Sequence, residues 1–133
     1  MHDLRIWIII TWISLPTVMY GGYALMRLLN RGNVLTPFQV SWFRAGHAHA
    51  GVLLVMALVY DTFMDTTSVS FGFKNLACAI LAVGILSQSG GFFVHLMVGQ
   101  PNQVSIGTTV TTVGAALLTL AVGLLAYALI VTP

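Results

Sequence analysis

Residues 107–130, GTTVTTVGAALLTLAVGLLAYALI, decide the fold, because they contain no charged residue over the length of a transmembrane helix. About 20 apolar residues in a helix cross roughly 30 Å of hydrocarbon. Three further apolar stretches precede this one, at about residues 4–26, 38–60 and 75–98. The four stretches take up most of the 133-residue chain. We therefore predict a single transmembrane domain over residues 1–133.

The composition of the chain excludes an ordinary soluble domain. Hydrophobic residues make up 58% of the sequence and charged residues 6%, against roughly 25% charged residues in soluble proteins. Backbone groups in hydrocarbon must be hydrogen-bonded within the membrane, and the sequence lacks the alternating polarity of barrel strands. Because the connections are short, successive helices should be antiparallel neighbours. We predict an all-α integral membrane four-helix bundle with up-down topology, multi-pass in a cell membrane.

The first stretch has a core at residues 6–15 with the length of a signal peptide. However, Arg5 is the only basic residue before this core, and apolar character resumes after Pro16. We therefore interpret the stretch as a retained helix that bends at Pro16. Lys and Arg number three on the side of the first connection and two on the other side, which favours both termini outside the cytoplasm.

The connections carry turn-forming residues, namely Asn30, Gly32, Asn33 and Gln100-Pro101-Asn102. Asp61 and Asp65 follow the second stretch, where we predict a solvated boundary and no catalytic carboxylate pair. This interpretation leaves no acidic residue inside the membrane. Cys78 lies in the third stretch with no second cysteine in the chain, so we expect it to have a packing role.

The most informative segment is WFRAGHAHAG at residues 42–51, because it places an arginine and two histidines inside a membrane span. Ionisable residues at such positions are costly and mark functional sites. His47 and His49 are two positions apart, which is about 200° of rotation on an α-helix. They should point to nearly opposite faces and cannot both bind one metal ion. Arg44 lies one turn before His47 and shares its face.

Other spans contribute polar groups in the same half of the bilayer. Gln88 on the third span matches the depth of the two histidines, whereas His95 lies nearer the interface, where a structural hydrogen bond is the more frequent role. Imidazole suits iron, copper and zinc, and Arg44 could pair with a propionate or another anion. The predicted cofactor, if one is bound, is haem b or a transition metal. The predicted cofactor-binding residues are His47, His49, His95, Arg44 and Gln88, with His47 and His49 as the metal ligands.

Small residues surround the two histidines. Gly46, Ala50 and Gly51 remove side-chain bulk from this helix. Small residues allow either close approach of a second helix or a flat ligand against the backbone. The sequence leaves both interpretations open.

His47-Ala48-His49 resembles an element of heme-copper oxidase subunit I, in which one helix carries two histidines that ligate two different hemes on its two faces. The resemblance implies haem ligation by His47 and His49. The chain departs from that family in its four spans and in its histidines, which are only His2, His47, His49 and His95, with His2 predicted outside the bilayer. Residues 44–51, 89–95 and 107–109 are similar to small uncharacterised bacterial integral membrane proteins of four helices. That similarity implies the bacterial plasma membrane and no particular activity.

Three functions are compatible with these features. The first is a haem- or metal-binding redox or sensing subunit, and the second is a non-catalytic accessory subunit of a larger membrane complex. The third is a small carrier or proton-linked transporter that acts as an oligomer, through Arg44 and the histidines. The partners predicted are the lipid bilayer and a membrane protein or a second copy of the chain. The net charge of +2 is dispersed and no nucleotide, zinc-protease or catalytic-triad motif occurs, which argues against nucleic acid binding and soluble-type enzyme chemistry.

Overall fold

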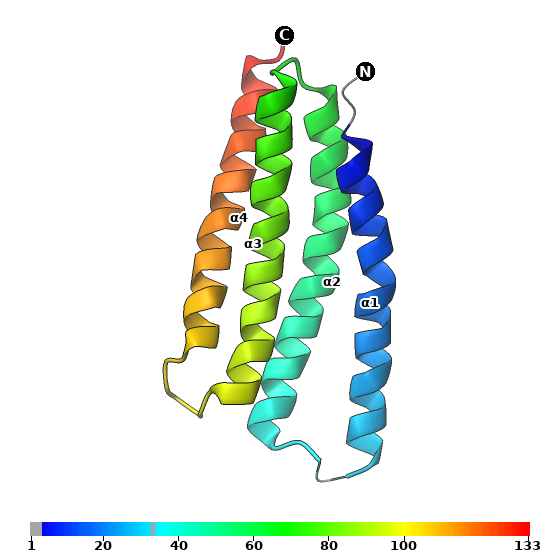
Figure 1. The fold of residues 1–133 in the computed structure, drawn as a ribbon, viewed down its shortest axis with the longest axis vertical. Coiled ribbons are helices and arrows are strands. Elements are labelled where there is room, and N and C mark those ends of the chain that lie inside the picture. Colours follow the sequence, from blue (N-terminus) through cyan, green and yellow to red (C-terminus); the bar gives the residue numbers. More distant parts are fainter. Residues whose placement is uncertain (1–3, 33) are drawn as a thin grey trace.

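The structure is a computed structural model that describes residues 4–32 and 34–133. Its elements are α1 (Arg5–Asn30), α2 (Pro37–Thr66), α3 (Phe71–Val98) and α4 (Ile106–Val131). Successive helices run in opposite directions, so both ends of the chain lie at one end of the molecule (Figure 1). The prediction of an all-α chain with four helices long and apolar enough to cross a membrane is confirmed. His2, predicted outside the bilayer, and Asn33, predicted in the first turn, lie outside the described residues.

Local capping explains where α2 begins and ends. Thr36 and Gln39 form a reciprocal capping box at its start, with Pro37 in the first turn. At its other end the helix continues for six residues past the predicted boundary at 60, to Thr66, and the Thr67 hydroxyl then donates to the carbonyl of Met64 at 2.7 Å. The helix therefore continues through the polar residues Asp61 and Asp65 and ends only at Thr66.

The longer α2 corrects the prediction for the two aspartates. Asp61 and Asp65 both lie within α2, and neither belongs to a connection. Asp65 is exposed, but Asp61 is only 2% exposed and faces the other helices. The prediction that Asp61 is a solvated residue in a connection is therefore wrong.

Helices α3 and α4 form the most closely packed pair. Small residues recur every seven positions on their facing surfaces, namely Ala77, Gly84 and Gly91 on α3 and Gly107, Gly114, Ala121 and Ala128 on α4. A Cβ atom at Gly114 would overlap the main-chain nitrogen of Gln88, and one at Gly107 would overlap the main chain of His95. A seven-residue spacing keeps these positions on one helix face, and the missing side chains let the two backbones meet.

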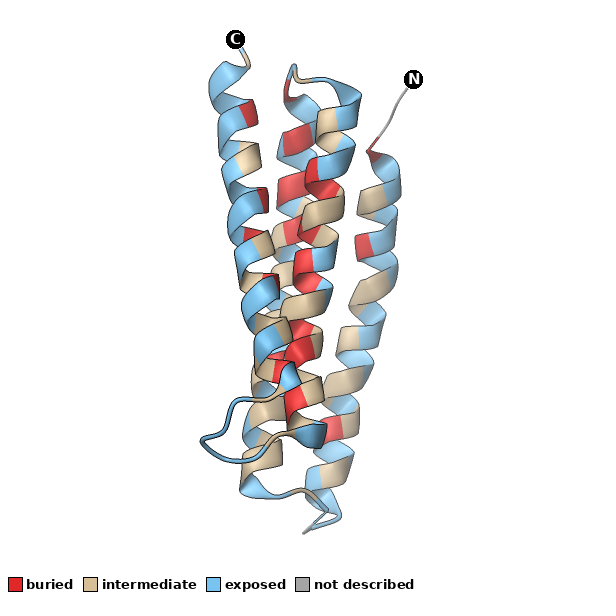
Figure 2. Ribbon diagram, turned by 60° about the vertical axis from the view of Figure 1, so that its left-hand side comes forward, coloured by how far each residue is buried: buried red, intermediate tan, exposed pale blue. Residues whose placement is uncertain are grey.

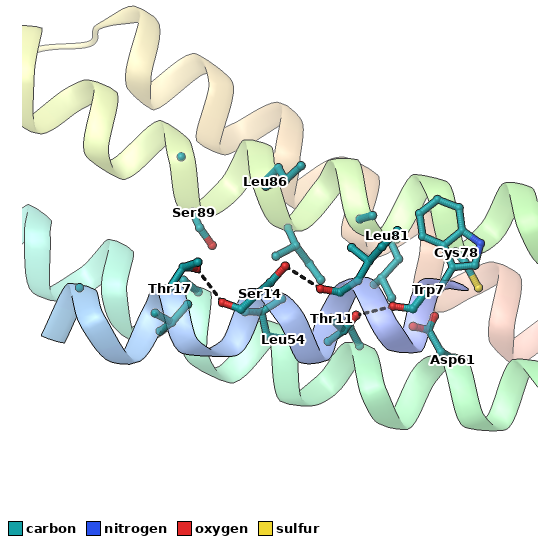
Figure 3. Close-up of a pocket in the computed structure, with 18 of the residues that line it drawn as sticks. Trp7, Thr11, Ser14, Thr17, Leu54, Asp61, Cys78, Leu81, Leu86 and Ser89 are labelled. Carbon is teal, nitrogen blue, oxygen red and sulfur yellow. Dashed lines mark hydrogen bonds between the residues drawn. The ribbon is translucent and has the colours of Figure 1, made fainter. Parts of the chain in front are cut away.

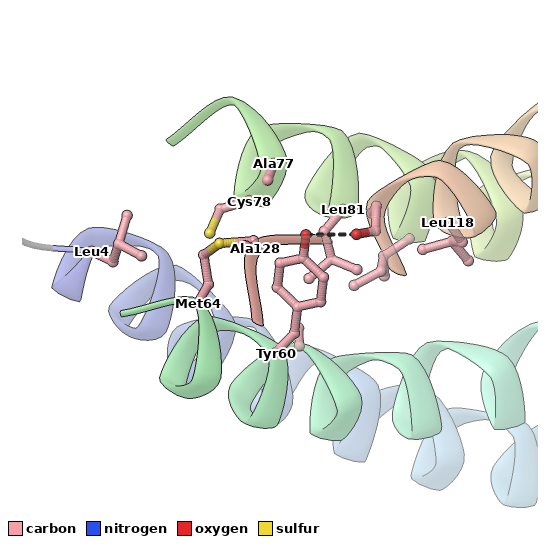
Figure 4. Close-up of a cluster of buried hydrophobic side chains, with 11 residues drawn as sticks. Leu4, Tyr60, Met64, Ala77, Cys78, Leu81, Leu118 and Ala128 are labelled. Atoms are coloured by element: carbon pink, nitrogen blue, oxygen red, sulfur yellow. Dashed lines mark hydrogen bonds between the residues drawn. The ribbon is translucent and has the colours of Figure 1, made fainter. Parts of the chain in front are cut away.

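Helix α2 packs over this pair through a buried cluster (Figure 4). Met64 and Leu81 are almost wholly buried. The Tyr60 hydroxyl donates to the Ala121 carbonyl at 2.8 Å and so links α2 to α4. Buried positions concentrate on the facing sides of α2, α3 and α4 (Figure 2).

Helix α1 is an outer helix that packs mainly against α2. In the most apolar 18-residue segment of each helix, 11% of the residues of α1 are buried, against 39% of those of α3. Near the chain ends the indole Nε1 of Trp7 donates to Asn75 Oδ1 at 2.9 Å, which ties α1 to α3. The helix continues through Pro16 without interruption. Because α1 lies beside α2 without closing fully onto α3, the molecule has a long cleft between these three helices.

Candidate functional site

The cleft between α1, α2 and α3 has a volume of about 390 Å³, within the roughly 300–1,000 Å³ of typical small-molecule sites. Most of its wall is apolar, with Leu54 from α2 and Leu81 and Ile85 from α3. Polar side chains lie along it at intervals (Figure 3). An apolar cavity with a few polar groups is the usual form of a ligand site.

The cleft runs along the helix axes for much of the membrane thickness. His47 lines one end and Asp61 the other, and at 1.5 Å per residue they are about 21 Å apart along α2. Measured from the middle of α2, they lie about 7 Å and about 14 Å away on opposite sides. Half of the hydrocarbon thickness is roughly 15 Å. With the middle of α2 taken as the centre of the bilayer, the His47 end lies inside the hydrocarbon and the Asp61 end lies close to its boundary.

Asp61 is the charged residue of the cleft. Its Oδ1 atom is buried and has no hydrogen-bond partner among the described residues. Cys78 of α3 and Trp7 of α1 line the same end, and Figure 3 shows Cys78 beside the carboxylate. A buried polar atom without a partner costs about 1–3 kcal/mol, and a charged one costs more. The carboxyl group, which has a hydrogen bond with the Cys78 thiol, therefore keeps one oxygen without a partner among the described residues.

Ser89 provides a second incomplete group. It is 7% exposed, and its Oγ atom has no hydrogen-bond partner within the described part of the chain. A Cβ at Gly46 of α2 would meet Phe92 and Phe93 of α3, and this antiparallel register sets Ser89 about one turn from the level of His47. His47 and Ser89 therefore belong to the same end of the cleft.

His47 packs against α1. A Cβ atom at Gly22 would lie 3.0 Å from His47 Nε2, and one at Gly21 would lie 3.5 Å from Nδ1. The two glycines of α1 thus make room for the imidazole. Neither ring nitrogen has a hydrogen-bond partner among residues 4–32 and 34–133. No hydrogen bond to a described residue therefore competes with a ligand for the imidazole.

His49 lies on the other side of α2. Its Nδ1 donates to the Ala45 carbonyl at 2.8 Å, and its ring stacks near Phe92 of α3 with centroids 4.7 Å apart. The two histidines thus face different helices, α1 for His47 and α3 for His49, as the rotation of about 200° predicts. His49 does not line the cleft.

His95 is held in a structural contact. It is 2% exposed, its Nδ1 lies 2.6 Å from Ser105 Oγ, and its ring lies edge-on to Trp42 with centroids 4.0 Å apart. Ser105 also accepts from the Gly107 backbone and caps α4. His95 therefore joins the end of α3 to the start of α4 and is not brought to the cleft.

Two other predicted site residues also lie away from the cleft. The main chain and Cβ of Gln88 face α4, where they contact Gly114, and its carbonyl accepts from Thr111 at 3.4 Å. Ser89, the next residue, occupies the position toward the cleft that was predicted for Gln88. Arg44 is exposed and lines a separate shallow depression with Pro37 near the start of α2. Neither residue is positioned to assist a ligand at His47.

These positions restrict how a metal or haem could be held. The described residues contain no group of three or more His, Cys, Asp or Glu side chains that could bind a metal ion. The space at Gly46 is filled by Phe92 and Phe93, so the small residue serves helix packing and leaves no slot for a flat ring. His47 is therefore the histidine that would hold such a group in the cleft, and neither His49 nor His95 lies there to pair with it.

Sequence reasoning missed the polar wall that α1 provides. Thr11, Ser14 and Thr17 recur at a spacing of three and line the cleft. Each hydroxyl donates to a carbonyl of its own helix, at 2.6–3.0 Å, which satisfies the donor and leaves the oxygen free to accept. Their spacing on an otherwise apolar helix was the available signal, since it marks one face.

A comparison of the chain with protein-family profiles, curated proteins and solved structures finds no match. The resemblances to heme-copper oxidases and to small bacterial membrane proteins therefore remain predictions.

Proposed function

We propose that this chain is an integral membrane protein that binds a lipid-soluble small molecule in the cleft between α1, α2 and α3. The observation that supports this function is that Asp61 and Ser89 line one largely apolar cavity and that each has a buried polar atom, Oδ1 and Oγ, without a hydrogen-bond partner among the described residues. A ligand group that bonds to either atom would remove its desolvation cost. The apolar body of the ligand would replace lipid or water along the walls.

The route into the cleft is lateral, from the bilayer. Helix α1 packs mainly on α2, so its contact with α3 is the weakest boundary of the cavity. Near the chain ends the hydrogen bond between Trp7 and Asn75 links α1 to α3. A lipid-soluble compound can enter where α1 moves away from α3, without crossing the packed interface of α3 and α4.

A second candidate function is a haem- or metal-binding redox or sensing subunit with His47 as the ligand. The observation that favours it is that His47 lines the cleft and keeps both ring nitrogens free of hydrogen bonds to described residues, whereas His49 and His95 do not. A bound haem would supply electron transfer or gas binding at its iron. The chain itself would supply one imidazole and an apolar wall.

The location and partners of the protein remain part of the proposal. The exposed apolar faces of α1 and α4 fit a lipid environment. A membrane-protein partner or a second copy of the chain would cover such faces equally well. A location in the bacterial plasma membrane rests only on the resemblance to small bacterial membrane proteins.

Replacing His47 by alanine is expected to lower ligand binding at least tenfold, or about 1.4 kcal/mol, while His49→Ala leaves binding unchanged. The reason is that His47 lines the cleft, whereas His49 does not. The measurement is displacement of a neutral fluorescent alkyl probe from detergent-purified protein, together with absorbance spectra of the oxidised and reduced forms and metal analysis.

The spectra separate the two candidate functions. A Soret band that is lost in His47→Ala and kept in His49→Ala would identify haem. Saturable probe binding without such a band supports a lipid-soluble ligand. Both functions would be contradicted if the probe does not bind saturably to the wild-type protein and the protein shows no Soret band and contains no metal.

A further inference from the structure

We propose that the Asp61 end of the cleft is a subsite for a lipophilic cation, an organic ammonium whose apolar body lies along the cleft. The inference rests on the proposed function, because the same cavity must accept the apolar body. It adds the charge of the ligand and its orientation, with the cationic group toward the ends of the chain.

The first argument is the carboxylate. Asp61 lines the cleft and is 2% exposed, and its buried Oδ1 has no hydrogen-bond partner among the described residues, although the Cys78 thiol hydrogen-bonds to the carboxyl group. Lys74 lies at the same end of the molecule, but its Nζ donates to the Asp65 carbonyl at 2.8 Å. In a medium of low dielectric constant an anion without a positively charged partner attracts a cation far more strongly than it does in water.

The second argument is the aromatic ring beside it. Trp7 lines the same end of the cleft, and its Nε1–H is bonded to Asn75 Oδ1 at 2.9 Å. That bond occupies the indole donor and fixes the ring in place. Ammonium groups bind well over the faces of aromatic rings, best of all tryptophan, when water is excluded. A carboxylate and an indole at one end of an apolar cavity therefore form a suitable pair for an organic cation.

The third argument is the polarity of the remaining wall. The hydroxyl groups of Thr11 and Ser14 donate to main-chain carbonyls of α1. Toward the cleft their oxygens can therefore only accept hydrogen bonds. Leu54, Leu81 and Ile85 supply apolar surface along the same path. No lysine or arginine is among the residues that line the cleft. The cavity thus attracts positive charge at the Asp61 end and apolar groups along its length.

The test compares two linear probes that differ in charge, dodecylammonium and the neutral dodecanol. Each is titrated against a neutral fluorescent alkyl probe bound to the full-length protein in nanodiscs, with empty nanodiscs as the partitioning control. The wild-type protein is expected to bind dodecylammonium at least tenfold more tightly than dodecanol. Asp61→Asn is expected to abolish this preference and to leave the affinity for dodecanol unchanged.

Two matched variants complete the experiment. Asp65→Asn removes an exposed carboxylate one turn further along α2 and should keep the full preference for the cation. Trp7→Phe keeps an aromatic ring with a weaker attraction for cations, and should lower the preference about threefold. If Asp61→Asn does not fold, the wild-type comparison and Trp7→Phe still decide the matter.

The outcomes separate the subsite from the cleft. Equal affinity of the wild-type protein for the two probes, or an undiminished preference in Asp61→Asn, would overturn the cation subsite while the cleft remains a binding site. Loss of binding for both probes and for the fluorescent compound would overturn the proposed function itself.

Discussion

Replacing Gly114 by alanine is expected to destabilise the protein by about 3 kcal/mol or more. The added Cβ would overlap the main-chain nitrogen of Gln88 and lie 2.7 Å from its Cα. Because those are backbone atoms of a packed helix, relief requires α3 and α4 to move apart. The measurement is the unfolding midpoint and free energy in mixed micelles, followed by circular dichroism.

Gly123 provides the matched control for this substitution. It lies on the same helix, and a Cβ there meets nothing within 4 Å. Gly123→Ala should therefore leave stability unchanged or raise it by about 1 kcal/mol through helix propensity. Equal effects of the two substitutions would show that the small residues of α4 do not determine how closely α3 approaches.

Replacing Ala50 by phenylalanine is expected to reduce binding of a neutral alkyl probe at least tenfold, or about 1.4 kcal/mol. Ala50 lines the cleft between the His47 end and Leu54, so a phenyl ring there would occupy the volume that the ligand needs. Probe titration of purified protein measures the effect.

Ala48→Phe is the control for cleft filling. Ala48 is exposed and lies two positions earlier on α2, which turns it to nearly the opposite face. The same added ring should therefore contact lipid and leave probe binding intact. If Ala48→Phe weakens binding as much as Ala50→Phe, the effect comes from general disturbance of α2 and the cleft is not the binding site.

The four helices could be predicted because membrane spans depend on local composition. Each stretch such as residues 107–130 is long and apolar enough on its own, and no tertiary contact is needed to recognise it. The ends of the helices depend instead on caps. Asp61 was taken as the end of a span because it is charged, whereas α2 continues to Thr66. The buried positions Ala57, Asp61 and Met64 follow helical spacing, which was the overlooked signal.

The candidate site was predictable only within one helix. The rotation of 100° per residue separates His47 from His49 without knowledge of their neighbours. Which neighbour each face meets depends on how α3 rotates against α4, and that rotation is set by Gly114 and its partners. A change of one residue in position turns a side chain by about 100°, which is the difference between Gln88 toward α4 and Ser89 in the cleft.

Small residues recur every seven positions in the sequences of α3 and α4. This recurrence alone does not predict that α3 packs against α4. Gly84 and Gly114 are unremarkable in separate spans, since glycine is frequent in membrane helices. Their role follows from backbone contact between the helices.

The most direct test of a ligand in the cleft is mass spectrometry of the small molecules that leave the protein when it is released intact from nanodiscs and then unfolded. We expect one lipid-soluble compound in near-stoichiometric amount from the wild-type protein and from Ala48→Phe, and at least tenfold less from Ala50→Phe, since a tenfold loss corresponds to about 1.4 kcal/mol. Equal amounts of bulk lipid from all three proteins, with no enriched compound, would contradict the account.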